Sequence, residues 1–208
     1  MLENIKVLSH SSIRIEDGKV MYFDPFQVEE EPHDADIIFI THSHYDHFSP
    51  EDIQKIVKED TLFVVPKTIL ADIEILHLGE DRIYALAPGE HTTVDGIRVE
   101  AVRAYNVGKK FHPKSNEWVG YIVCAGAIRY YIAGDTDMNE DNLGVKCDVA
   151  LVPVGGTYTM DAEQAVEFVN ILAPKAAVPT HYGSIVGEVK DAQDFVRNVS
   201  GNVQAVIR

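Results

Sequence analysis

The order of apolar and polar residues predicts many short strands along the whole chain. Apolar or alternating runs bounded by turn residues are typical of strands, and they occur at residues 5–8, 12–16, 19–23, 37–40, 62–65, 119–124, 128–133, 149–152, 176–179 and 203–207. Residues 82–103 alternate around Asp95-Gly96, which predicts a run of antiparallel strands. Asp17-Gly18 predicts a hairpin in the same way.

Apolar positions spaced three and four apart predict helices among these strands, at residues 50–58, 66–76, 161–172 and 191–199. The first helix has a clear start, with Ser49 as N-cap and Pro50 at the first helical position. Helices and strands occur in both halves of the chain, which is typical of an α/β protein. No internal repeat, low-complexity segment or linker appears, so we expect one domain over residues 1–208.

The charge of the chain limits the partners that it can bind. Its 208 residues include 18 basic and 33 acidic ones, a formal net charge of −15, which disfavours a broad nucleic-acid or anionic membrane surface. A small anionic substrate remains compatible, because bound cations invert the local field. Cys124 and Cys147 have no C-x-x-C partner, and neither a signal peptide nor a membrane-spanning run is evident. We therefore expect a cytoplasmic protein.

Three histidines and one aspartate lie together directly after the apolar run 37–40, as His42-x-His44-x-Asp46-His47. Imidazole and carboxylate groups are ligands for zinc, iron and manganese. In an extended segment His42 and His44 point the same way, whereas Asp46 and His47 come where the chain turns. One loop is thus able to serve two adjacent cations. The alternative interpretation is a solvated polar loop that is rich in histidine.

Three more polar residues follow predicted strands. Asp135 follows the run 128–133, and a carboxylate at a strand end can bridge two cations; the alternative is a turn aspartate. His181 follows the run 176–179, where it either completes a coordination sphere or is an ordinary core or surface histidine. Asp24 precedes Pro25, and it either caps a turn or orients a ligand histidine.

The segment 105–117 is a long irregular loop, and such a loop in a compact domain is usually functional. It carries Lys109, Lys110 and Lys114 in an otherwise acidic chain. These lysines either form an edge that binds an anionic group or make a solvated basic loop. Taken one at a time, each lysine favours the solvated loop.

Together these features resemble the metallo-β-lactamase-fold hydrolase superfamily. The residues that carry the resemblance occur in the family's order over nearly the whole chain: Asp24, His42-x-His44-x-Asp46-His47, Gly134-Asp135-Thr136 and Thr180-His181-Tyr182-Gly183. The short length, the start containing His10 and the loop Pro153-Val154-Gly155 are more similar to the branch of ascorbate-6-phosphate lactonase and related metal-dependent hydrolases. The resemblance implies a four-layer αββα sandwich with the site at one edge of its two sheets. It also implies two divalent metal ions, usually zinc and sometimes manganese or iron.

The resemblance also implies a ligand set. His42 and His44 bind the first metal, Asp135 bridges the two, and the second metal takes three further ligands, Asp46, His47 and His181.

A third histidine is expected on the first metal, and here the chain departs from the family. Asn106 stands where related sequences often carry histidine, and His112 is the only histidine between Asn106 and Asp135. We therefore assign His112 as the missing ligand. His10 either contacts the site from the first hairpin or is a buried, hydrogen-bonded histidine, and we expect the latter. The remaining histidines are expected at the surface: His33, His77 and His91.

The implied activity is metal-dependent hydrolysis, in which a metal-bridged hydroxide attacks a small ester, lactone or phosphoester. We expect Asp46 and His112 to be the catalytic residues. Asp46 orients the hydroxide, and His112, Tyr158 or Tyr182 assists the leaving group. The alternatives are a phosphodiesterase or nuclease of the same fold and a non-catalytic metal-binding scaffold. We expect a small-molecule substrate, with neither a membrane nor a nucleic-acid partner.

Overall fold

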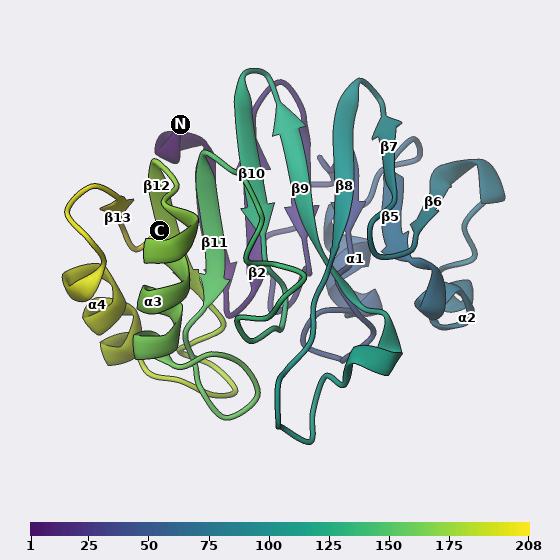
Figure 1. Ribbon diagram of the computed structural model, residues 1–208. Helices are drawn as coiled ribbons and strands as arrows, with labels where there is room; N and C mark the ends of the chain where they lie inside the picture. Colours follow the sequence, from purple (N-terminus) through teal and green to yellow (C-terminus); the bar gives the residue numbers. More distant parts are fainter.

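The computed structural model describes residues 1–208, and its strands form two mixed sheets that pack face to face (Figure 1). The first sheet contains, in spatial order, β1 (Ile5–Ser9), β2 (Ser12–Glu16), β3 (Val20–Phe23), β4 (Ile37–Phe39), β5 (Leu62–Pro66) and β6 (Ile83–Leu86). The second sheet has the order β13-β12-β11-β10-β9-β8-β7. Its strands are β7 (His91–Val94), β8 (Ile97–Arg103), β9 (Val119–Ala125), β10 (Ile128–Ile132), β11 (Val149–Pro153), β12 (Ala176–Thr180) and β13 (Gln204–Ala205).

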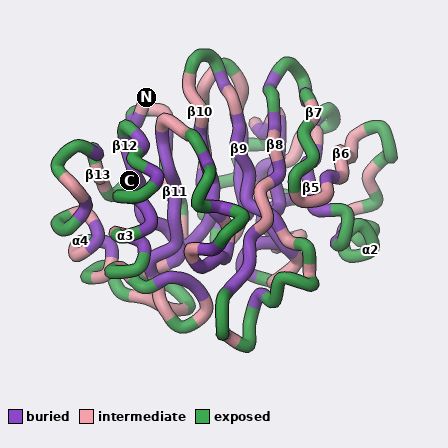
Figure 2. The backbone as a smooth tube through the Cα atoms, viewed as in Figure 1, coloured by how far each residue is buried: buried purple, intermediate pink, exposed green.

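A large apolar core fills the space between the two sheets, where Figure 2 shows mostly buried backbone. Phe23 and Phe39 stack there with ring centroids 4.5 Å apart. Tyr121 joins the sheets, because its hydroxyl on β9 donates to the carbonyl of Ile40, 2.8 Å away, just after β4. The tyrosine thus buries its ring while its polar atom stays hydrogen-bonded.

Helices cover the outer faces. α1 (Pro50–Ile56) and α2 (Leu70–Ile73) pack Ile53 and Ile73 against the first sheet. α3 (Ala162–Leu172) and α4 (Val189–Asn198) pack Phe168 and Phe195 against the second. The four layers are helix, sheet, sheet and helix, which confirms the predicted αββα sandwich. None of the helices has the length and hydrophobicity that a bilayer crossing requires.

Two predicted elements differ from the structure. The helix expected over residues 66–76 is broken into 3₁₀ turns on either side of α2 and ends at His77, which adopts a left-handed φ of 50°. The run 82–103 is not one antiparallel unit, because β6 pairs with β5 in parallel while β7 and β8 form a hairpin in the other sheet. The turn 87–90 carries the chain from one sheet to the other.

The strand directions determine where the polar loops meet. β3, β4 and β5 are parallel in the first sheet, and β10, β11 and β12 are parallel in the second. The segments that follow β3, β4, β10 and β12 contact one another at one edge of the sandwich. This edge therefore gathers every polar strand end that the sequence singled out.

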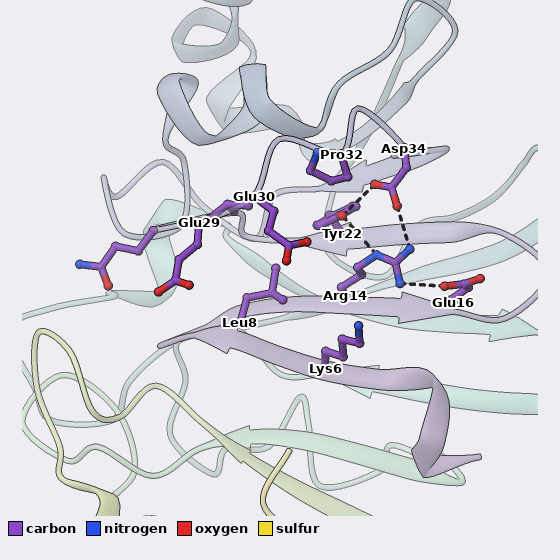
Figure 3. Close-up of a pocket in the computed structure, with 11 residues that line it drawn as sticks. Lys6, Leu8, Arg14, Glu16, Tyr22, Glu29, Glu30, Pro32 and Asp34 are labelled. Carbon is purple, nitrogen blue, oxygen red and sulfur yellow. Dashed lines mark hydrogen bonds and ion pairs between the residues drawn. The ribbon is translucent and has the colours of Figure 1, made fainter.

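The outer face of β1–β3 is not covered by a helix and forms a hollow of about 360 Å³ (Figure 3). Arg14 is one of the residues that line it, with its guanidinium 2.8 Å from Glu16 and 2.8 Å from Asp34. Tyr22 donates to Asp34 as well. The charge of Arg14 is thus satisfied within the hollow, and the hollow lies apart from the edge where the polar strand ends meet.

Candidate metal centre

The loop after β4 is held in place by its own backbone and by Asp24. The Thr41 N–H donates to Oδ1 of Asp24 and the Thr41 hydroxyl donates to Oδ2, both at 2.7 Å. The N–H groups of His47 and Phe48 donate to the carbonyl of His44 at 2.9 and 2.8 Å. A tight turn is therefore fixed on the end of a buried strand, and its side chains project from a rigid support.

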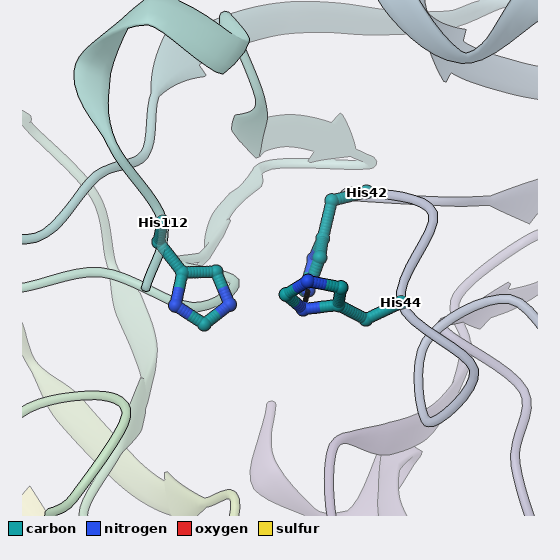
Figure 4. A group of neighbouring side chains, drawn as sticks. All are labelled: His42, His44 and His112. Atoms are coloured by element: carbon teal, nitrogen blue, oxygen red, sulfur yellow. Dashed lines mark hydrogen bonds between the residues drawn. The ribbon is translucent and has the colours of Figure 1, made fainter. Parts of the chain in front are cut away.

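His42, His44 and His112 form the first group of candidate ligands (Figure 4). One ring nitrogen from each lies within 4.8 Å of the others, and Nε2 of His42 is 3.0 Å from Nδ1 of His44. The ring of His112 faces these two, with its centroid 5.1 Å from His42 and 4.9 Å from His44. Two of the rings are buried and His44 is partly exposed.

Asn106 positions His112 in this group. Its N–H donates to the carbonyl of His112 at 2.8 Å, and its Nδ2 lies 3.2 Å from Nδ1 of the ring. The same amide donates to the carbonyl of Phe111 at 3.0 Å. Nδ1 of His112 therefore faces Asn106, and Nε2 faces Asp135 at 3.1 Å. The loop 105–117 thus places His112 beside His42 and His44, although residue 106 is an asparagine and not a histidine.

A second group surrounds Asp135. Its Oδ1 is 3.2 Å from Nε2 of His47, and its Oδ2 is 3.1 Å from Nε2 of His181 and 3.9 Å from Nε2 of His42. Asp46 lies on the open side, with Oδ2 3.5 Å from Nε2 of His47 and 3.8 Å from Nε2 of His181. The two oxygens of Asp135 thus face ring nitrogens on both sides of the cluster.

Asp24 acts on this second group without entering the pocket. Its Oδ2 accepts a 2.7 Å hydrogen bond from Nδ1 of His47. Of the two roles considered for Asp24, this geometry favours orientation of a ligand histidine, because the bond leaves Nε2 free to face inward. Asp24 also bonds Thr41, so it supports the turn at the same time.

His10 lies nearer to the cluster than expected. Its ring is buried, but neither ring nitrogen has a hydrogen-bond partner, so the expected hydrogen bond is wrong. Nε2 of His10 is 3.6 Å from Oδ2 of Asp46, and its ring centroid is 4.0 Å from that of His181. The carbonyl of His10 also accepts from the N–H of His181 at 2.8 Å. The turn between β1 and β2 is therefore part of the wall of the centre.

The buried atoms without a partner test whether the cluster suits a cation. Buried side-chain nitrogens and oxygens that make no hydrogen bond are rare in proteins, and most of those in this chain belong to the cluster: His10, His47, His112, Asp135 and His181. Nitrogen and carboxylate atoms that converge without hydrogen-bond partners are a suitable donor set for a divalent transition metal. The residues present therefore fit a metal ion.

The pKa values of the cluster residues also bear on metal binding. Burial raises the pKa of a carboxyl group, but the neighbouring His181, His47 and His112 hold the pKa of Asp135 well below its usual range. Burial, together with His47, moves the pKa of His42 well below that of an ordinary histidine. An ionised carboxylate and a neutral imidazole are the states in which these two groups ligate a metal. Burial opposes protonation of His47, but Asp135 and Asp24 raise its pKa well above that of an ordinary histidine, so His47 would release a proton on binding a cation.

Two tyrosines and three histidines remain from the sequence analysis. Tyr158 lines the pocket in front of the cluster, whereas Tyr182 packs against the apolar layer between the second sheet and its helices. Tyr182 is not among the residues that border the pocket. The exposed histidines are the three expected at the surface: His33, His77 and His91.

Trp118 is a site residue that the sequence did not single out. It is the only tryptophan in the chain, and its ring centroid lies 4.7 Å from His42, 4.8 Å from His44 and 5.5 Å from His112. A single tryptophan just before β9 and shortly after His112 was the available signal. Its indole supports one side of the first histidine group.

Comparison with known proteins agrees with this geometry. A family model described as a beta-lactamase superfamily domain matches residues 4–181. A UPF0173 metal-dependent hydrolase of Thermococcus kodakarensis is 30% identical over 98% of this chain and 95% of its own. A crystal structure from Parabacteroides distasonis has a TM-score of 0.81 at 29% identity, covering 98% of this chain and 91% of that one.

A second solved structure shows the same fold at lower identity. It is a metallo hydrolase from the archaeon Ignicoccus hospitalis, with a TM-score of 0.79 at 24% identity, and it covers 98% of this chain and 94% of its own. The narrower resemblance to ascorbate-6-phosphate lactonase stays a prediction. The chain therefore belongs to the beta-lactamase superfamily and is a metal-dependent hydrolase with the metallo-β-lactamase fold.

Proposed function

We propose that this chain binds two divalent cations side by side and uses them to hydrolyse a small ester, lactone or phosphoester. In this assignment His42, His44 and His112 hold the first cation, and Asp135 bridges the two. The second cation takes the remaining ligands, Asp46, His47 and His181. Zinc is the favoured metal because the donors are mainly imidazole nitrogens, with manganese or iron as the other candidates.

The observation that carries this proposal is the position of Asp135. Its two oxygens lie 3.2 Å from Nε2 of His47 and 3.1 Å from Nε2 of His112, so one carboxylate faces both histidine groups. Three sets of candidate ligand atoms occur in the cluster, one of them containing Asp135, and the atoms within each set lie within 4.8 Å of one another. A buried carboxylate in this position would be costly without a compensating positive charge.

The residues of the chain have separate tasks in the proposed reaction. The residues around Asp135 would hold the cations, which would supply Lewis acidity and lower the pKa of a water molecule toward neutrality. Asp46 borders the pocket, so it orients the attacking water and accepts its proton. Asp24 and Asn106 hold His47 and His112 in place. Tyr158 borders the same pocket and is available to the leaving group.

The test is metal analysis combined with hydrolysis assays. The protein is purified without chelator, reconstituted with zinc or manganese, and analysed for metal per chain. We expect two metals per chain and turnover of lactones, esters or phosphoesters. A protein that takes up no metal after reconstitution, or that holds two metals yet cleaves none of these substrates, would contradict the proposal.

A further inference from the structure

The pocket in front of the candidate metal centre has an apolar rim on loops that lie far apart in the sequence. The rim consists of Tyr45, Phe111, Tyr158 and Ile185, and the pocket that it borders has a volume of about 210 Å³. Phe111 and Tyr158 meet edge to face, with centroids 4.8 Å apart at 82°. The pocket floor is formed by candidate ligands, so a bound molecule would touch both the rim and the centre.

The rim exposes large apolar side chains to water. Tyr45 is 65% exposed, Phe111 is 42% exposed and Ile185 is 36% exposed. Apolar side chains gathered around a concave site mark a surface that a ligand covers, whereas a single exposed one is ordinary. The rim thus favours a substrate whose non-reacting part is apolar.

The lysines of the neighbouring loop do not supply a site for an anionic group. Lys109 lies 2.5 Å from Asp137 and donates to the carbonyl of Thr159 at 2.6 Å, so its charge is already paired. Lys114 pairs with Glu140 and Asp141 at 2.7 and 2.9 Å.

Lys110 is exposed, with its ammonium 5.8 Å from the ring centroid of Phe111, and it is not among the residues that border the pocket. No arginine or lysine borders the pocket at all. Recognition of a phosphate group usually relies on such side chains. The pocket therefore offers an anionic substituent no partner except the cations themselves.

We propose that the substrate is a small, uncharged carboxylic ester or lactone that carries an apolar group, and that Phe111 and Ile185 select this group. This inference rests on the proposed function and narrows it. The oxygen of water adds to the carbonyl carbon, the bond from that carbon to the ester oxygen breaks, and a proton passes to the departing oxygen. The products are a carboxylic acid and an alcohol, joined in one molecule when the substrate is a lactone.

The test compares two lactones that differ only in an apolar chain, δ-valerolactone and its pentyl-substituted relative δ-decalactone. For the zinc-loaded protein we expect kcat/KM to be at least about tenfold higher for δ-decalactone. In Phe111→Ser the advantage should fall to about twofold or less, because the wall that contacts the chain is gone. Lys110→Met is the matched control from the same loop, and it should leave the advantage unchanged.

A binding measurement that does not need activity accompanies the kinetics. The metal-free protein is titrated with δ-decalactone by calorimetry at two temperatures. We expect saturable binding with a negative heat-capacity change, as apolar burial requires, and much weaker binding to Phe111→Ser. Absence of binding, or equal binding by the two proteins, overturns the inference.

The outcomes separate this inference from the proposed function. If the loaded protein prefers bis(4-nitrophenyl) phosphate to δ-decalactone and Lys110→Met lowers that activity, the inference is wrong and the proposed function stands. If the protein takes up no metal and hydrolyses nothing, the proposed function fails. Calorimetry on the metal-free protein then still decides whether the rim binds an apolar lactone.

Discussion

Asp24 accepts a 2.7 Å hydrogen bond from Nδ1 of His47, and this bond directs Nε2 of the same ring toward Asp135, 3.2 Å away. The two residues are 23 positions apart and follow neighbouring parallel strands. Asp24 adopts a left-handed φ of 47°, a conformation that is uncommon outside glycine. The relationship fixes which nitrogen of His47 is free to bind a cation.

Asp24→Asn should weaken metal binding without removing a proposed ligand. The amide keeps the size of the side chain but loses the negative charge that favours Nδ1–H, so we expect metal affinity to fall about 10–100-fold. Competition with a chromophoric chelator measures this change. Asp34→Asn is the matched control, since Asp34 pairs with Arg14 far from the centre. Equal affinities for the two variants would show that Asp24 is only a turn residue.

His112→Ala should remove one cation per chain. His112 is the single member of the first histidine group that comes from the second half of the chain, and without it two histidines and a shared carboxylate remain. We expect the metal content after reconstitution and desalting to drop from two toward one, as read by elemental analysis. His91→Ala, which changes an exposed histidine, should keep both. Retention of two metals by His112→Ala would exclude the assignment.

Chelation should lower the thermal stability of the protein. The proposed ligands include buried groups from both sheets, so cations would bind the folded chain and not the unfolded one. Each cation present at 100 times its Kd contributes about 2.7 kcal/mol. Melting curves with and without chelator should therefore separate by several degrees, and Trp118 fluorescence should change as metal is restored because its ring contacts the histidines. Coincident curves would argue against tight metal binding.

Gly155→Ala should destabilise the fold next to the centre. A Cβ at this glycine would lie 2.1 Å from the carbonyl oxygen of His181, so the loop that carries His181 must move. We expect a loss of about 1–3 kcal/mol in urea unfolding, together with weaker metal binding. Gly144→Ala provides the comparison, because a Cβ there has no heavy atom within 4 Å. Similar stability of the two variants would show that the loop adjusts freely.

Asp52 should make stability depend on acid pH. Burial opposes its ionisation, but Lys55, Ser49 and the N–H groups of Gln27 and Val28 bond the carboxylate and hold its pKa below the usual value. A carboxyl with a lowered folded pKa stabilises the protein above its unfolded pKa of about 3.9, and this contribution is lost as the pH falls through the folded pKa.

The corresponding experiment compares wild type with Asp52→Asn by urea unfolding. Wild type should be more stable by about 1–3 kcal/mol at pH 7, and the difference should shrink as the pH is lowered below about 3.9. Asp60→Asn, at an exposed carboxyl, should give little difference at any pH. A difference of constant size across the pH range would mean that the charge of Asp52 contributes nothing.

Most strands, most helices and the neighbourhood of the cluster were predictable from local signals, whereas the αββα arrangement was implied by the family resemblance. The run Ile37-Ile38-Phe39 is typical of a buried strand. The histidines that follow it are close in the sequence, so they stay close in space however the rest of the chain packs. Asp135 and His181 were found because each follows an apolar run that must be a core strand. The family resemblance implied a third histidine on the first metal, and His112 was the only histidine between Asn106 and Asp135. The structure places it beside His42 and His44.

The missed features depend on contacts between segments far apart in the sequence. The surroundings of the His10 ring depend on how the turn after β1 packs against the segment after β12, where His181 lies. No local sequence pattern encodes this contact. The sequence around Trp118 has no pattern that distinguishes a residue beside the metal centre from an ordinary core residue. The pairing of β6 with β5 depends on a chain reversal at residues 87–90 that alternation alone does not indicate.

The division of the strands between the sheets has a consequence for assembly. Strands β1–β6 all lie before residue 87, strands β7–β13 all lie after residue 90, and no strand of one sheet pairs with a strand of the other. Cleavage in the turn 87–90 would give two fragments, each with all the strands of one sheet. The earlier fragment would carry His42, His44, Asp46 and His47, and the later one His112, Asp135 and His181. Neither would hold the proposed pair of cations alone, so bound cations would add to the apolar core in favouring reassembly of the fragments.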